Sequence, residues 1–183
     1  MGQLVKAQGG QQPATKEEPV IQQFLTFDLQ GEMFGINILP IKEIIEYGKI
    51  TAVPMVPSYV RGVINLRGNV VPVIDLPVRF GWQSSAVNKR TCIVIIEVEH
   101  GDEAMDIGVV IDSVSEVLDI EEKDIGASPS FGAKIRTDFI AGMGRVHDDF
   151  IVLLNPSKVL SVEELADLQQ MPQRQAADGG AEP

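Results

Sequence analysis

Short runs of apolar residues, separated by turn-forming residues, recur along most of the chain. The runs cover residues 24–29, 33–38, 70–76, 91–98, 107–111 and 150–154. Apolar segments of this length, bounded by Gly, Asn and Asp, are typical of strands in antiparallel sheets. The segment 157–170 differs, because Val159, Leu160, Leu165 and Leu168 form an apolar stripe at helical spacing. The pattern predicts an all-β protein with one C-terminal helix.

The two halves of the chain resemble each other. Segments that match between the halves keep their order: 34–45 with 107–118, 59–63 with 139–143, and 70–75 with 150–155. Apolar positions match easily by chance, but Gly35 also falls on Gly108 and Glu43 on Glu116. Units of about 70 residues are too short for two immunoglobulin-type sandwiches, so we expect two related barrels of about five strands each. A groove between two such barrels is the expected binding site.

The ends of the chain differ from the segment between them. Residues 1–19 and 171–183 are rich in Gln, Gly and charged residues and poor in large apolar ones, which predicts mobile tails. Residues 20–170 form the predicted folded domain. We expect its first subdomain to span 20–85 and to include the C-terminal helix, and its second to span 86–156.

Composition and charge narrow the class of partner. Apolar residues make up 44% of the 183 residues and aromatic ones only 5%, so Val, Ile and Leu dominate the expected core. The net charge of −11 repels phosphate backbones and anionic lipids, which argues against a nucleic-acid partner. No apolar stretch approaches the roughly 18 residues of a transmembrane helix, and the single cysteine allows no internal disulfide. We therefore expect a cytoplasmic protein without direct membrane insertion.

The chain offers few residues for catalysis. Its histidines are His100 and His147, and the triplet 147–149 (His-Asp-Asp) superficially resembles part of a metal site. A hydrolytic metal site needs further His and Asp ligands. The duplication instead aligns this triplet with 67–69, and 66–69 (Leu-Arg-Gly-Asn) predicts a tight hairpin because Gly and Asn tolerate positive φ angles. Phosphate-binding glycine loops and nucleophile motifs are absent from the sequence. We expect no enzymatic activity, metal or cofactor.

The most distinctive segment, 61–81, reads RGVINLRGNVVPVIDLPVRFG. It resembles the signature of the CheW family of chemotaxis coupling proteins and of the CheW-like domains of chemotaxis histidine kinases. The resemblance runs from Phe24 to Leu168 through FLTF, FGINIL, IKEI, VVIDSVSEV, FIAG and IVLL. It implies two five-stranded SH3-like barrels, in agreement with the duplication. It also implies a cytoplasmic adaptor that is recruited to membrane receptor arrays in chemotaxis signal transduction.

The resemblance further implies two partners. The cytoplasmic helical tip of a methyl-accepting chemoreceptor binds in the groove between the barrels, and the CheW-like regulatory domain of the histidine kinase CheA binds subdomain surfaces that the sequence does not identify. A length of 183 residues favours a stand-alone coupling protein over the kinase or the receiver-fused CheV type. Two alternatives stay open: the same fold in a non-flagellar chemosensory kinase system, and, less favoured, a small metal-dependent enzyme around His147.

Arg67 is the residue that we expect to bind the receptor. Its counterpart in the second half is His147, so the arginine does not belong to the duplicated scaffold. A planar guanidinium suits pairing with a carboxylate, and the family position of Glu43 makes it the expected partner. Glu116 occupies the equivalent place in the other half, which favours a role for Glu43 in the barrel itself. For Arg67 the alternative is an exposed turn residue without a function.

The remaining expected site residues fall into two groups. Apolar residues at positions that the family uses near the receptor groove are Ile38, Ile41 and Cys92. Burial in the core is the competing interpretation of all three. Residues expected to shape the turn and scaffold of the signature are Gly62, Asn65 and Gly68.

Overall fold

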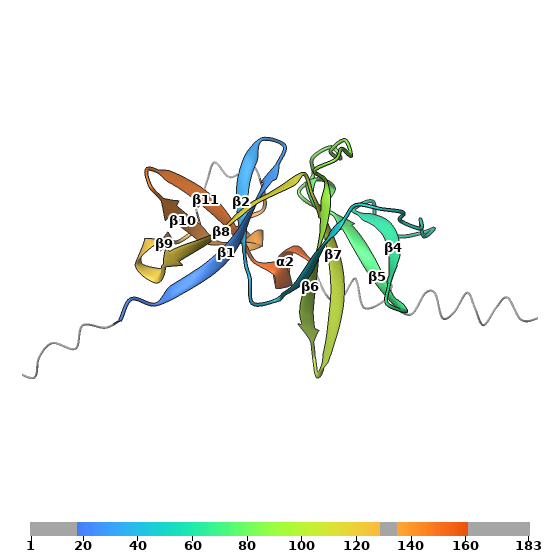
Figure 1. The fold of residues 1–183 in the computed structure, drawn as a ribbon, viewed down its shortest axis with the longest axis horizontal. Coiled ribbons are helices and arrows are strands. Elements are labelled where there is room, and N and C mark those ends of the chain that lie inside the picture. The colour runs from blue at the N-terminus through green and yellow to red at the C-terminus, as the bar shows by residue number, and fades with distance from the viewer. Residues whose placement is uncertain (1–17, 129–134, 161–183) are drawn as a thin grey trace, which may run out of the picture.

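The computed structural model describes residues 18–128 and 135–160, within which eleven strands form two sheets. One sheet has six strands in the order β8 (Ser113–Glu121), β1 (Ile21–Leu29), β2 (Glu32–Asn37), β11 (Asp149–Leu154), β10 (Ile140–Val146) and β9 (Ile125–Gly126). The other has five, in the order β3 (Ile41–Glu46), β6 (Cys92–His100), β7 (Glu103–Ile111), β5 (Asn69–Asp75) and β4 (Val60–Leu66). The sheets lie side by side (Figure 1).

Short helices follow three of the strands: α1 (Leu76–Arg79) follows β5, the 3-10 turn η1 (Glu122–Asp124) follows β8, and α2 (Pro156–Val159) follows β11. A second 3-10 turn, η2 (Thr137–Phe139), precedes β10. The six predicted apolar runs all form strands, and the two β units confirm the predicted pair of SH3-like barrels. The predicted helix over 157–170 lies largely outside the described residues. So do the predicted tails, of which only Glu18 and Pro19 are described.

The internal duplication is confirmed in the strand registers. In the six-stranded sheet β2 and β11 run parallel, with Gly35 opposite Leu153. In the five-stranded sheet β7 and β5 run parallel, with Gly108 opposite Val73. The sequence alignment of the halves maps one pair of residues onto the other. The two sheets therefore form equivalent barrels, here called the six-stranded barrel and the five-stranded barrel.

Each barrel combines strands from both halves of the chain, which differs from the predicted division near residue 85. The hairpin β1–β2 shares its sheet with β8 to β11, and the hairpin β6–β7 shares its sheet with β3 to β5. The links explain this exchange. Only Asp112 separates β7 from β8, whereas a reversal into the same sheet needs a turn of at least about two residues. The chain therefore continues from β7 into the other sheet, as it does between β2 and β3.

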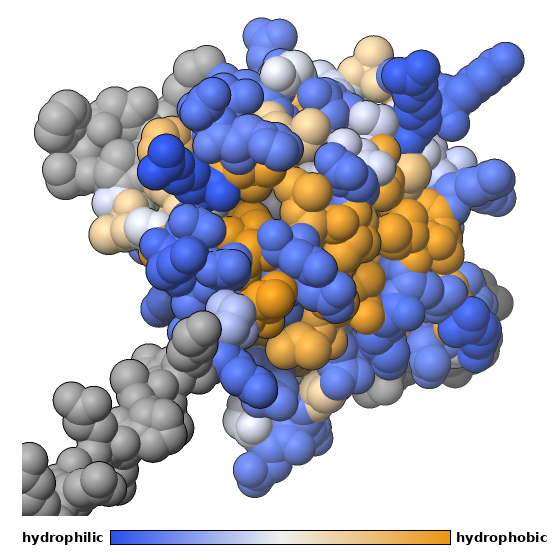
Figure 2. Space-filling model, turned by 60° about the vertical axis from the view of Figure 1, so that its left-hand side comes forward, coloured by the Kyte–Doolittle hydropathy of each residue, from blue (hydrophilic) through white to orange (hydrophobic). Residues whose placement is uncertain are grey.

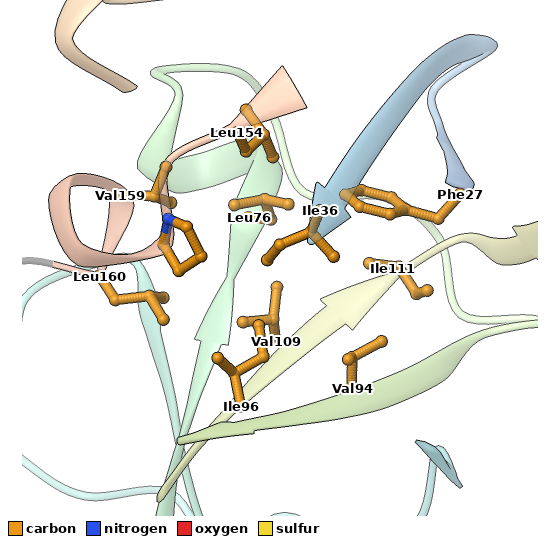
Figure 3. Close-up of a pocket in the computed structure, with 11 residues that line it drawn as sticks. Phe27, Ile36, Leu76, Val94, Ile96, Val109, Ile111, Leu154, Val159 and Leu160 are labelled. Atoms are coloured by element: carbon orange, nitrogen blue, oxygen red, sulfur yellow. The ribbon is translucent and has the colours of Figure 1, made fainter. Parts of the chain in front are cut away.

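The largest apolar cluster lies between the barrels and fixes them to each other. Phe34 of β2 and Phe80 after α1 bring their ring centroids to 5.6 Å, and Phe80 lies 6.0 Å from Phe139. Apolar side chains of both sheets and of α2 turn toward one another around a cavity of about 20 Å³ (Figure 3). A space of this size has room for about one water molecule. Smaller clusters fill each barrel: Val71, Val73, Ile93, Ile95 and Val110 in one, Phe24, Ile120, Ile151 and Leu153 in the other.

Candidate functional site

The signature segment forms the β4–β5 hairpin, which confirms the predicted turn. Leu66 pairs with Asn69, and the two residues between them have positive φ angles of 51° at Arg67 and 86° at Gly68. The positive φ predicted at Asn69 is instead found at Arg67. The Asn65 side chain accepts a hydrogen bond of 2.9 Å from the Gly68 N–H. This bond closes the turn and fixes the direction in which Arg67 leaves the backbone.

Gly62 lies at a bulge near the start of the hairpin. Its φ is 147°, and a Cβ atom there would lie 2.1 Å from the carbonyl oxygen of Thr51. Thr51 and Val63 exchange two backbone hydrogen bonds of 2.9 Å, so the close approach belongs to a small sheet-like bridge. Glycine is required here for both conformation and space.

Arg67 pairs with Glu43, the partner that the sequence proposed. Nη1 donates to Oε1 at 2.8 Å and Nη2 donates to Oε2 at 3.0 Å. The contact joins the hairpin tip to β3. The Arg67 side chain is 76% exposed and that of Glu43 is 26% exposed, so the pair contributes at most about 1 kcal/mol to folding. The pair has a larger effect on the position of Arg67, because the Glu43 carboxylate holds the guanidinium plane in one orientation at the surface.

The three apolar candidates are partly buried, and all pack against the cluster between the barrels. Ile38 and Ile41 flank the link through which the chain passes from β2 to β3, and the Ile41 N–H donates to the Ile38 carbonyl. Cys92 begins β6 and pairs with Ile111, the last residue of β7. After Ile111 the chain passes into the six-stranded sheet. Across the strand pair β3–β6, Ile41 lies opposite Ile96 and Glu43 lies opposite Ile95, so the bulge between them turns these two side chains to opposite faces of the sheet. Cys92 lies on the same face of the sheet as Ile41, at the other end of the pair, opposite Glu46.

The equivalent place on the six-stranded barrel is arranged differently. His147 has a φ of 55° at the tip of the β10–β11 hairpin, as predicted from the duplication. Within the part of the chain that the structure describes, no ion pair joins His147 to Glu116. The Glu116 backbone instead exchanges two hydrogen bonds with the Thr26 hydroxyl, of 2.7 and 3.1 Å. The arginine–glutamate pair is therefore a feature of one barrel alone.

Sequence reasoning missed a second polar cluster in the signature. The Arg61 Nε donates to Asp75 at 2.8 Å, and its terminal nitrogens donate to the Tyr47 hydroxyl at 2.8 Å and to Ser84 Oγ at 2.7 Å. Asp75 is only 3% exposed and also caps α1 by accepting from the Val78 N–H. Burial lowers the pKa of Arg61, but the hydrogen bonds to Asp75 and Tyr47 outweigh it and raise the pKa overall. The cluster anchors the strand that leads to Arg67.

Comparison with known proteins assigns the family. A family model described as the CheW-like domain matches residues 23–164, which includes both barrels and the signature. This chain belongs to the CheW family. The chemotaxis protein CheW of Klebsiella aerogenes is 36% identical over 149 residues, covering 81% of this chain and 87% of that protein. CheW of Helicobacter pylori is 34% identical over 155 residues, covering 85% and 90%.

A solved structure of the CheW family supports the same assignment. The scaffolding protein CheW of Thermoanaerobacter tengcongensis is 31% identical and superposes with a TM-score of 0.68, over 76% of this chain and 88% of that one. Across residues 18–128 and 135–160 of this CheW-family chain, no three His, Cys, Asp or Glu side chains gather to hold a metal ion. The helices of those ranges are all too short or too polar to cross a membrane.

Proposed function

We propose that this chain is a non-catalytic chemotaxis adaptor that couples transmembrane chemoreceptors to the histidine kinase CheA. The observation that carries the proposal is the Arg67–Glu43 pair. The pair lies at the surface, and its arginine, unlike Glu43, has no counterpart in the other half of this CheW-family chain. A guanidinium that is fixed by one carboxylate and largely exposed offers further N–H donors to a partner's carboxylate or carbonyl groups.

The apolar part of the receptor site is formed by Ile38 and Ile41. A helical tip docks through a few apolar anchors that enter a groove, and both isoleucines are partly buried at the link between the barrels. They leave part of their surface for a partner while their other side packs on the core. Cys92 contributes at the second link. The adaptor works at the cytoplasmic side of receptor arrays, and CheA binds through its own CheW-like domain.

The proposal is tested by reconstitution of CheA with receptor-bearing membranes, with and without this protein. The protein is expected to sediment with the membranes and to raise kinase activity. Arg67→Glu is expected to weaken co-sedimentation at least about tenfold, since a charge-assisted hydrogen bond contributes about 1.5–3 kcal/mol. Its folding stability is expected to fall by only about 1 kcal/mol, because the pair that it replaces is exposed.

Two further variants separate a specific role from a general charge effect. Arg136 forms a comparable exposed pair with Asp138, at 2.6 and 3.1 Å, so Arg136→Glu is the matched control and should keep receptor binding. Exchange of the charges in Arg67→Glu with Glu43→Arg should restore part of the lost binding. Wild-type protein that neither sediments with receptors nor alters kinase output contradicts the adaptor. If the double variant binds receptors no better than the single variants, only the proposed role of the Arg67–Glu43 pair is contradicted.

A further inference from the structure

Two surface grooves occupy equivalent places on the two barrels. On the five-stranded barrel a groove of about 310 Å³, the charged groove, is lined by residues that include Lys42, Asn69, Val70, Glu97, Met105 and Asp106. On the six-stranded barrel a groove of about 400 Å³, the apolar groove, is lined by residues that include Met33, Ser115, Glu116, Val146, Asp149 and Phe150. The duplication places Ser115 on Lys42, Met33 on Asp106 and Phe150 on Val70.

The charged groove is saturated by its own side chains. Glu97 and Asp106 lie opposite each other on β6 and β7, where two like charges repel. Lys42 reduces this repulsion: its Nζ lies 3.1 Å from Asp106 and 3.4 Å from Glu97, and the hydrogen bond to Asp106 raises the pKa of Lys42. The Lys42 side chain lines the groove and so occupies part of its surface. A partner would have to displace a satisfied ion cluster to enter.

The apolar groove lacks that cover. Ser115 takes the place of Lys42. Met33 takes the place of Asp106, and Phe150 that of Val70. The Phe150 side chain is 64% exposed and Met33 is 38% exposed. Figure 2 shows apolar side chains gathered near the middle of one face of the molecule, with polar side chains around them. Because the equivalent residues of the sister barrel are smaller or charged, the fold itself does not require a large exposed ring here.

The rim of the apolar groove carries negative charge. Glu116 and Asp149 line it beside His147, and no Lys or Arg is among the lining residues that the structure describes. The nearest arginine in the strand register is Arg145, which lies opposite Phe150 on β10. We propose that the apolar groove docks a short segment of a partner protein that inserts one or two large apolar side chains and carries Lys or Arg beside them. Apolar anchors supply affinity in such a groove, and the acidic rim selects the flanking charge. This site lies on the opposite barrel from Arg67 and does not depend on the proposed receptor contact.

Two methionine methyl groups report on the two grooves in one experiment, since Met33 lines the apolar groove and Met105 the charged one. The probes are a Lys-Lys-Leu-Phe-Lys-Lys peptide and its counterpart with Glu in place of each Lys. In methyl NMR of the full chain, the lysine peptide is expected to shift the Met33 signal in a saturable way. The Met105 signal and the glutamate peptide should show no such response.

Matched variants test the geometry. Phe150→Asp is expected to weaken binding of the lysine peptide at least tenfold. Val70→Asp, at the equivalent place in the charged groove, should change the affinity for this peptide by less than twofold. Met33→Asp with Ser115→Lys copies the ion cluster of the sister groove and should also abolish binding, read from the Val146 methyl signals. Arg67→Glu, which tests the adaptor proposal, should leave the response intact.

Several results would overturn the inference. Equal shifts at Met33 and Met105, equal responses to both peptides, or full binding by Phe150→Asp each contradict a specific basic-apolar partner. A Met33 signal that changes on dilution without peptide would assign the groove to a second copy of the chain. A change on substituting Lys6 and Lys16 by Glu, again without peptide, would assign it to the chain's own N-terminal segment.

Discussion

The hairpins β4–β5 and β10–β11 have the same backbone and different tips. Both have a two-residue turn, and the first turn residue has a φ of 51° at Arg67 and 55° at His147. Arg67 pairs with Glu43, but His147 forms no such pair with Glu116. The turn geometry therefore belongs to the duplicated scaffold, and the charge at its tip does not. Function in a duplicated fold is best sought where the backbone agrees and the side chains disagree.

The same contrast holds at the base of the hairpins. Asp75 and Asn155 precede equivalent short helices, and the N–H of each donates to the carbonyl just before the strand β4 or β10. Only Asp75 has a cation beside it, since Ala141 stands where the other barrel has Arg61. The five-stranded barrel thus carries both the buried ion pair and the exposed one.

The largest difference between the barrels is expected at their bulge glycines. Gly62→Ala places a methyl group against the Thr51 carbonyl at 2.1 Å and forces alanine to a φ of 147°. We expect it to lower the free energy of unfolding by more than about 3 kcal/mol. Gly142→Ala meets a side chain at 2.8 Å and a carbonyl at 2.9 Å without the φ strain, so its cost should be smaller. Urea unfolding checks both. Equal costs would contradict different demands on the two bulges.

The buried ion pair is the next largest test. Arg61→Ala leaves Asp75 unpaired at 3% exposure, and we expect a loss of about 3 kcal/mol. Adding Asp75→Asn copies the Ala141 and Asn155 of the other barrel. The double variant should recover most of the stability in urea unfolding, because no unpaired charge is then left buried. The Asn155 side chain, which it copies, makes no capping hydrogen bond in the other barrel. If the double variant is as unstable as Arg61→Ala, the loss comes from packing of the Arg61 side chain and not from the unpaired charge.

The strands that the sequence predicted and those that it missed differ in their pattern. Continuous apolar runs such as 70–76 form central strands with both faces covered. The segments IKEIIE and SVSEVLDIE interleave charged residues, and both form strands at a sheet edge, β3 and β8. The chain reaches β8 through the single-residue link at Asp112 and reaches β3 through residues 38–40. Such short links become apparent only when the bounds of both neighbouring strands are known.

The predicted and the missed polar pairs differ for a related reason. The Glu43–Arg67 pair followed from family position. The Arg61–Asp75 pair was missed because an unbroken ladder from Leu66 and Asn69 would place Arg61 opposite Ile74, on the other face from Asp75. The bulge shifts the register by one residue. A glycine inside a strand pattern is the signal that could have indicated such a bulge.

The exposed pair should contribute little to stability. A double-mutant cycle with Arg67→Ala and Glu43→Ala is expected to give a coupling of at most about 1 kcal/mol, since exposed pairs are weak and screened. Urea unfolding at low and high salt measures it. A coupling well above this that persists in 1 M salt would show that the pair holds the barrel together, and would weaken the argument that Arg67 serves a partner.

The smallest effect is expected when the arginine of the five-stranded barrel is introduced at the equivalent turn of the six-stranded barrel. His147→Arg places a guanidinium on a turn with nearly the same φ as that of Arg67, with Glu116 at the position equivalent to Glu43. If the duplicated backbone sets the geometry of the pair, the free energy of unfolding of the variant should rise by about 0.5 kcal/mol at low salt. The gain should vanish in a Glu116→Gln background and in high salt. A gain that survives Glu116→Gln would come from the general attraction between a cation and a protein of net charge −11. In that case backbone equivalence would not be enough to recreate the contact, and the position of Glu43 beside the bulge in β3 would be part of what makes the five-stranded barrel the functional one.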